Sequence, residues 1–257
     1  MNRSISHWRF ALRWTGTHVL LSLAVAALAA SLVFGLWYPD PWRQMLGVGS
    51  IFAIVIAVDV VCGPLLTLVL ANPKKSRREL WLDMSVVALI QLAALGYGLW
   101  AVFSARPVVM AFEVDRWVVV TANEIDVKQL SNAPPGLQSL PIAGLHHVAV
   151  REARSHEEQL QSIEYSVQGL TPAMRPGWWI PVAEAKAAID LRTRPLSELM
   201  ARRPLESAVI EAAVDRTQLP ITRLRYLPLT TSKTLDWIVL MNEVGDIVGY
   251  VQVDGFD

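Results

Sequence analysis

One carboxylate, Asp59, lies within an apolar stretch that is long enough to cross a bilayer. The stretch reads AIVIAVDVVCGPLLTLVL over residues 53–70, and a charged residue at such a place is costly and is functional by default. Pro64 follows on the same stretch, and because it has no N–H it should free the helix carbonyl of Val60. Gly63 gives the chain room to bend there. These residues predict a polar intramembrane cluster of a carboxylate, a freed carbonyl and a kink.

Gln91 is a second polar residue at a similar depth, on the next apolar stretch. Asp59 lies 11 residues before Leu70, and Gln91 lies nine residues after Leu82. At about 1.5 Å per residue, these separations are roughly 17 Å and 13 Å from the same membrane surface. We therefore expect the two side chains within about one helical turn of each other in depth.

Gln91, Ala94 and Gly98 share one face of their predicted helix. A small face with a polar residue favours close packing between membrane helices. Two compatible interpretations of Asp59 stay open. In the first, Asp59 is protonated and hydrogen-bonds Gln91, and this bond only holds the two helices together (the glue interpretation). In the second, it meets a polar group on the helix of a partner protein.

The residue spacing gives little support for a protease, a metal site or another enzyme active site. An intramembrane aspartyl protease would need Asp59 and Asp83 to share a proton, but Asp83 lies at the mouth of its span. His146, His147 and His156 suggest a metal site, yet adjacent histidines on a strand point to opposite faces. Motifs of zinc proteases, phosphate-binding loops, serine hydrolases and C-x-x-C pairs do not occur. We expect no catalytic residue, no metal and no cofactor.

Three apolar stretches must position these residues, at 17–37, 46–70 and 82–103. Each meets the requirement of about 20 residues for a bilayer core. The first, with its basic front, has a signal peptide as its alternative. Its long apolar core and the two spans that follow favour an uncleaved anchor.

Basic residues predict the orientation of these spans. They gather at the N-terminus and in the loop at 72–79. The loop carries four of them, Lys74, Lys75, Arg77 and Arg78. We expect the N-terminus and this loop in the cytoplasm, and residues 105–257 outside it. The same four side chains suit anionic lipid headgroups, although their topogenic role already explains them.

Charge and composition also divide the chain. Residues 1–104 hold 8 Lys+Arg and 4 Asp+Glu, whereas residues 105–257 hold 15 and 19. Neither half is basic enough to indicate nucleic acid as a partner. A single cysteine, Cys62, excludes an intrachain disulfide. We predict three transmembrane α-helices at 1–104, followed by an extracytoplasmic α+β domain at 105–257.

The second region mixes strand and helix signals. VVMAFEVDRWVVVTA predicts two strands that meet at Asp115 and Arg116. SHEEQLQSIEYSV, with Ser155 as N-cap, predicts a helix. Further helices are expected in VAEAKAAIDL and PLSELMARRPLESAVIEAAVDRT, with Pro204 starting the last one. The C-terminal stretch predicts strands, with a turn at Gly245–Asp246.

Trp178 and Trp179 lie in an irregular stretch, GLTPAMRPGWWIP. Three interpretations stay open for them: a binding lip, an anchor on the membrane surface, and core packing.

Three segments together resemble one family. They are LWYPDPW, VDVVCGPLLTLVLANPKKSRRELWLDMSVVALIQLAALGYGLWAV and ARPVVMAFEVDRWVVVTANEI. They are similar to the type IV pilin accessory proteins of the TfpX/TfpZ (FimB-like) family, most strongly over residues 35–126. The resemblance implies an inner-membrane protein of a Gram-negative bacterium that supports the assembly or stability of a particular pilin. It implies no catalytic residue, cofactor or metal.

The resemblance also implies a client with one apolar helix, a glutamate near the start of that helix, and a periplasmic head. We hypothesise a chaperone-like protein that binds this pilin, together with membrane lipids, before the pilin enters the fibre. The contacts with the pilin helix would be made by Asp59, Gly63, Pro64, Gln91 and Gly98. Residues 105–257, with Trp178 and Trp179, would contact the head, and two modest contacts on one scaffold give avidity.

Two alternatives belong to other classes of protein. A structural subunit of the assembly platform would bind other pilus assembly proteins and serve every pilin. A pilin-modifying enzyme would need a titratable pocket in 105–257. All three hypotheses place a multi-pass protein in the bacterial inner membrane, with the N-terminus cytoplasmic and the C-terminal domain periplasmic.

Overall fold

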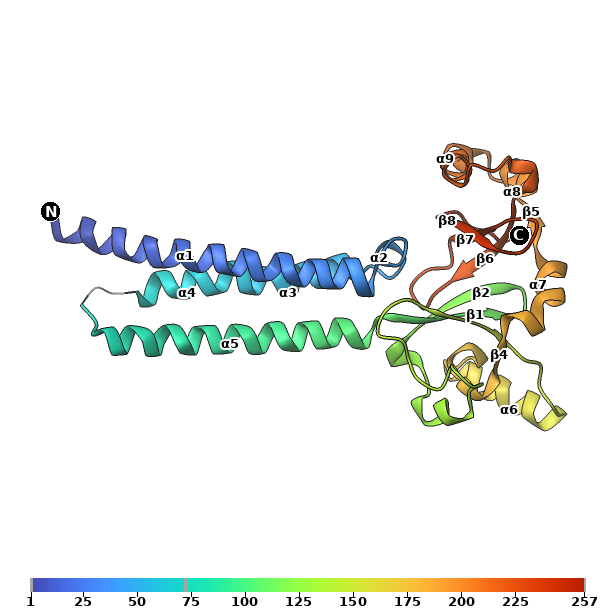
Figure 1. Cartoon of the computed structure of the whole chain (residues 1–257), viewed down its shortest axis with the longest axis horizontal. Helices are drawn as coiled ribbons and strands as arrows, with labels where there is room; N and C mark the ends of the chain where they lie inside the picture. The colour runs from blue at the N-terminus through green and yellow to red at the C-terminus, as the bar shows by residue number, and fades with distance from the viewer. Residues whose placement is uncertain (1, 72–73, 257) are drawn as a thin grey trace. The chain divides into compact units, whose positions relative to one another are not determined.

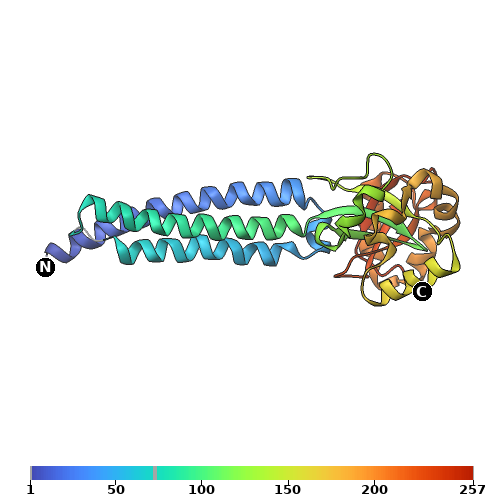
Figure 2. The same ribbon diagram turned by 90° about the horizontal axis from the view of Figure 1, so that it is seen from below.

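A computed structural model describes residues 2–71 and 74–256 of the chain. The chain divides into two compact units, Met1–Ser104 and Ala105–Asp257. The first unit consists of helices and the second is built on a β-sheet (Figures 1 and 2). The predicted fold class, three membrane helices followed by an α+β domain, is confirmed.

Among the described residues, three helices are long and apolar enough to cross a membrane, namely Phe10–Trp37, Val48–Leu70 and Arg77–Ser104. The first span combines α1 (Asn2–Leu32) with a π-helical turn, η1 (Val33–Trp37), and the short α2 (Trp42–Met45) follows it. The second combines α3 (Val48–Ala57), a second π-helical turn, η2 (Val58–Cys62), and α4 (Gly63–Leu70). The third is α5 (Arg77–Ser104). The outer spans are longer than predicted because their helices continue into the polar flanks.

The middle span holds the first unit together. The first helix, α1, packs along η2 and α4, and α5 packs along α3, η2 and α4, whereas α1 and α5 make few contacts with each other. Figures 1 and 2 show the three long helices running side by side. At one end, the Tyr38 hydroxyl donates to the carbonyl of Val102 over 2.9 Å and ties the first span to α5.

Polar side chains define the opposite end of the bundle. Lys75 Nζ donates to the carbonyl of Leu70 (3.2 Å) and to Asp83 Oδ2 (2.6 Å), so it caps α4 and links it to α5. Ser76 and Glu79 form a capping box at the start of α5, with bonds of 3.2 and 2.8 Å. Of the basic loop predicted at 72–79, residues 72 and 73 lie outside the described residues. Lys74, Arg77 and Arg78 are exposed.

The second unit has a mixed eight-stranded sheet. Along the sheet the order is β4 (Trp179–Pro181), β3 (His146–Val150), β1 (Pro107–Glu113), β2 (Arg116–Thr121), β6 (Arg225–Thr230), β7 (Trp237–Met241) and β8 (Ile247–Val251). A short β5 (Arg194–Pro195) also pairs with β6. The β1–β3 and β2–β6 pairs are parallel, and the others are antiparallel.

Helices and short turns cover this sheet. The helices are α6 (His156–Val167), α7 (Lys186–Arg192), α8 (Leu196–Arg202) and α9 (Ser207–Thr217). The 3₁₀ turns are η3 (Ala122–Glu124), η4 (Val127–Asn132), η5 (Pro172–Met174), η6 (Pro176–Trp178), η7 (Val182–Ala185), η8 (Pro204–Glu206) and η9 (Ile221–Arg223).

Figure 1 shows α8 and α9 together beside β6–β8, and α6 near the opposite end of the sheet. One core packs Leu199 and Ile210 against Tyr226 and Leu240. A second core gathers Val109, Val148, Ala173 and Trp179 beneath the 3₁₀ turns.

Several local predictions are confirmed. Ser155 caps α6 by accepting from Glu158 N over 3.1 Å. The predicted β1–β2 hairpin is present, but it turns at Val114 and Asp115, one residue earlier than predicted, because Arg116 already pairs with Glu113. Pro204 opens the short turn that leads into α9. Gly245, with φ +97°, turns the chain between β7 and β8. The short strands β3, β4 and β5 were not predicted.

Candidate functional site

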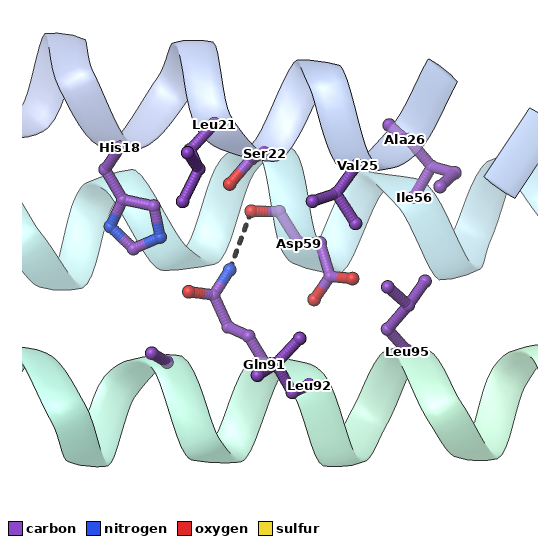
Figure 3. A pocket seen from close by; sticks show the side chains of 11 residues that line it. His18, Leu21, Ser22, Val25, Ala26, Ile56, Asp59, Gln91, Leu92 and Leu95 are labelled. Carbon is purple, nitrogen blue, oxygen red and sulfur yellow. Dashed lines mark hydrogen bonds between the residues drawn. The ribbon is translucent and has the colours of Figure 1, made fainter. Parts of the chain in front are cut away.

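The π-helical turn η2 carries the polar cluster of the first unit. In a π turn, the carbonyl of residue i bonds to the N–H of residue i+5. For Asp59 that residue is Pro64, which has no N–H to give. Gln91 Nε2 supplies the missing donor and bonds the main-chain oxygen of Asp59 over 2.9 Å (Figure 3). The sequence singled out the carbonyl of Val60, the α-helical partner of position 64, and the π turn adds the carbonyl of Asp59.

Two glycines let the helices approach at this level. A Cβ on Gly63 would overlap the side-chain amide of Gln91. A Cβ on Gly98 would lie 2.6 Å from Val55 Cγ1 on α3. Gly98 is buried, as predicted for close helix packing, and Gly63 and Pro64 are buried too. Ala94 differs from this prediction, because it is exposed.

The side chain of Asp59 is 7 % exposed and lines a cavity of about 120 Å³. Its Oδ1 atom has no hydrogen-bond partner within the part of the chain that the structure describes. Figure 3 shows the carboxyl group pointing into the space between the helices, near Leu95. An unsatisfied buried polar atom is rare and calls for an explanation.

The cavity opens between the first and third spans. Most of its lining residues belong to α1 and α5, and the second span contributes Ile56 and Asp59. The lining side chains are His18, Leu21, Ser22, Val25, Ala26, Ile56, Asp59, Ala88, Gln91, Leu92 and Leu95. The cavity is therefore mostly apolar, with a few polar groups that converge on Asp59.

His18 of α1 was not singled out from the sequence. Its Nδ1 lies 2.5 Å from Thr67 Oγ1, and this hydrogen bond joins α1 to α4. Thr67 is buried, whereas His18 is half-buried at the edge of the cavity. The sequence signal that could have identified His18 is its position as a polar residue inside the first apolar span.

The structure separates Asp83 from Asp59. Asp83 pairs with Lys75 at the end of the bundle, 2.6 Å away. The shared proton of an aspartyl protease is therefore not supported by these two carboxyl groups. Among the described residues, no group of three or more His, Cys, Asp or Glu side chains is placed to hold a metal ion.

In the second unit, two guanidinium groups lie against the ring of Trp178. The Cζ atoms of Arg151 and Arg175 are 4.4 and 4.6 Å from the centre of its ring. Arg151 makes a two-pronged ion pair with Glu158, with bonds of 2.9 and 2.6 Å. These bonds, with one from Arg154 N, lower the pKa of Glu158 from 4.5 to about 2. The cluster therefore fixes Trp178 in place.

Trp178 lines a groove of about 930 Å³ at the carboxyl ends of β1 and β3. Its two sides come from α6 and α7, and Val167 and Leu191 on these sides are 84 % and 81 % exposed. Glu113 lies in the groove, and burial raises the pKa of its carboxyl group. Large apolar side chains that gather around a polar-edged groove are typical of a protein-binding surface. Trp178 is itself only 8 % exposed. Trp179 is 2 % exposed, and its Nε1 donates to the carbonyl of Ala173 over 2.9 Å.

Comparisons with known proteins identify the family. The family model described as fimbrial assembly protein FimB matches residues 6–47. Two proteins of Dichelobacter nodosus, "Fimbrial assembly protein, serogroup I" and "Fimbrial assembly protein, serogroup E1", are 33 % and 32 % identical to this chain. Each match covers 96 % of this chain and 97 % of the relative. The chain belongs to the fimbrial assembly protein family. No solved structure matches it.

Family membership confirms the FimB-like resemblance and extends it over both units. A shorter relative, "Fimbrial assembly protein, serogroups C1 and C2" of the same organism, is 42 % identical over 48 % of this chain and 95 % of its own length. The family-model match ends at residue 47, before Asp59.

Proposed function

We propose that this protein holds a type IV pilin in the membrane before the pilin enters the fibre. Membership of the fimbrial assembly protein family supports a role in fimbrial assembly. The observation that carries the more specific proposal is the buried Oδ1 of Asp59, which faces a cavity inside the apolar bundle and has no hydrogen-bond partner among the described residues. Burying such an atom without a partner costs about 1–3 kcal/mol, and a bound helix that supplied one would recover this free energy.

The proposed location is the inner membrane of a Gram-negative bacterium. The basic residues at the N-terminus and in the loop at 72–79 support a cytoplasmic position for both. With three spans between them and this cytoplasmic N-terminus, residues 105–257 would then lie in the periplasm. Lys74, Arg77 and Arg78 are exposed and suited to anionic lipid headgroups.

In this proposal the pilin makes two contacts with one protein. Its apolar helix packs against the first unit at Asp59, with Gln91, Pro64 and the two glycines, Gly63 and Gly98, shaping the surface. Its head contacts the groove beside Trp178, where exposed apolar side chains are gathered. Trp179 supports this groove from the core.

Crosslinking in native membranes tests the proposal. A photoreactive residue at position 59 or 91 should capture pilin, and full-length protein should co-purify with pilin from detergent. Deleting the gene should lower the amounts of pilin and surface pili while prepilin processing stays intact. A matched probe at position 90, where Ile90 is 60 % exposed on the same helix, should capture less pilin.

The structural-subunit alternative predicts a different crosslinking pattern. Crosslinks from positions 59 and 91 would then reach only other assembly proteins, and no pilin would accompany the purified protein. Exchanging pilin alleles in one strain separates the two functions further, because a platform subunit serves every pilin and a client-specific protein serves one.

A further inference from the structure

We infer that Asp59 is the acceptor for a hydrogen-bond donor carried at mid-depth by a transmembrane helix that lies over the gap between α1 and α5. This inference rests on the proposed function, since the helix in question is the client's. It adds the position of the helix and the chemistry that recognises it. The ligand class is an apolar helix with one hydroxyl, amide or ammonium group.

The hydrogen bonds around Asp59 indicate which group can bind its side chain. Gln91 Nε2 is engaged with the main-chain oxygen of Asp59, and His18 Nδ1 is engaged with Thr67. Within the described residues, Oδ1 of Asp59 receives no hydrogen bond. A carboxyl group keeps an acceptor oxygen in either protonation state. A donor therefore satisfies Oδ1 in either protonation state, whereas an acceptor would satisfy it only with the proton on Oδ1.

The size of the cavity decides what enters it. A helix is about 10–12 Å across with its side chains, so a cavity of about 120 Å³ accepts the polar end of a side chain but not a helix. The helix itself must lie over the opening. Ala26 and Ala88 line the cavity from α1 and α5 and leave room for such an approach.

The apolar walls strengthen the recognition. Leu21, Val25, Leu92 and Leu95 surround the polar groups, so a donor that reaches Oδ1 lies in a medium of low dielectric constant. A client helix without a donor leaves Oδ1 unsatisfied and gains nothing at this position. Asp59 therefore selects for a donor at one depth rather than for a general apolar surface.

Synthetic transmembrane peptides test this inference with the purified full-length protein in liposomes. One peptide is an all-Leu/Ala helix, the second carries a single Asn at its centre, and the third carries this Asn two turns away. Energy transfer between labelled protein and peptide reports binding. The central-Asn peptide should bind about 3- to 30-fold more tightly than the other two, as expected for one interhelical hydrogen bond.

Two variants should abolish this preference. Asp59→Leu removes the acceptor, and Ala88→Leu fills the cavity from an exposed position of α5. Asp83→Asn, which changes a carboxylate paired with Lys75 outside the cavity, should keep the preference. Thermal unfolding of each variant in detergent establishes that it is folded.

Equal binding of the three peptides, or an unchanged preference in Asp59→Leu, would overturn the inference. Co-purification of pilin with the wild-type protein would then leave the proposed function standing. In the opposite case, a preference for central Asn without any pilin captured from membranes would keep the donor site and reject pilin as its occupant.

Discussion

At the residue scale, substitutions of Asp59 distinguish a structural role of its side chain from a role in binding the pilin. The Gln91 side chain donates to the main-chain oxygen of Asp59. Replacing the side chain of Asp59 therefore leaves this hydrogen bond in place. We predict that Asp59→Leu changes the unfolding temperature little but lowers the amount of bound pilin several-fold. Asp59→Asn, which keeps an acceptor oxygen, should bind pilin almost as well as the wild type. Thermal unfolding in detergent and pilin co-purification measure the two effects. A large loss of stability in Asp59→Leu would instead establish the glue interpretation.

Glu158 gives the second unit a predictable response to acid. Hydrogen bonds from Arg151 and Arg154 N lower its pKa from 4.5 to about 2 in the folded state. A group with a lowered folded pKa stabilises the fold above its unfolded pKa, and this contribution is lost as the pH falls through the folded pKa. The wild type should therefore lose stability between about pH 5 and pH 2.

Substitution of Glu158 should flatten this response. In Glu158→Gln the neutral amide no longer titrates, so the unfolding temperature should fall less steeply over the same pH range. Glu157→Gln, a change at the exposed neighbour, should keep the wild-type slope. Tryptophan fluorescence of the full-length protein in detergent provides the measurement. Identical slopes for Glu158→Gln and the wild type would contradict the assigned ion pair.

At the scale of elements, the sequence predicted features whose signals are local. The three spans follow from apolar length, the start of α6 from Ser155, and the β7–β8 turn from Gly245. The turn η2 was missed because it depends on Pro64 together with Gln91 of another helix. The strands β3, β4 and β5 are short and gain their stability from pairing with distant segments.

The candidate site was predictable to a similar extent. Counting residues along the two spans predicted that Asp59 and Gln91 lie at a similar depth in the membrane, and the structure joins them by a hydrogen bond. The identity of the bonded atom, the cavity and the role of His18 depend on how α1 packs, which no residue pattern specifies. In the second unit, the groove depends on the placement of α6 and α7 around the ends of two parallel strands.

Two glycines on α5 provide a matched test of helix packing. A Cβ on Gly98 would lie 2.6 Å from Val55 Cγ1, whereas nothing lies within 4 Å of a Cβ on Gly96. We predict that Gly98→Ala destabilises the bundle by about 1–3 kcal/mol, because α5 must move away from α3. Gly96→Ala should be neutral or slightly stabilising, since Ala favours helix. Unfolding of both variants in detergent measures the difference, and equal effects would refute the close approach.

At the scale of the whole molecule, charge predicts the orientation in the membrane. Reporter fusions after Asn132, which is exposed in the second unit, should be active only with a periplasmic reporter. Fusions after Arg78, in the basic segment, should be active only with a cytoplasmic reporter. A cytoplasmic reporter that is active at Asn132 would overturn the proposed layout and the proposed contact with a periplasmic head.

A double variant tests whether both units bind the same pilin. Asp59→Leu removes the acceptor in the bundle, and Leu191→Asp places a charge at an 81 % exposed position of the groove, where the fold should tolerate it. If one pilin bridges both contacts, each single variant keeps partial binding through the other contact, and the double variant loses most of it. Leu205→Asp, at a 95 % exposed position that does not line the groove, is the matched control and should bind like the wild type. The amount of co-purified pilin is measured for the four variants and for the wild type. A double variant that binds as well as Asp59→Leu alone would show that the groove does not contribute, and pilin recognition would then rest on the bundle.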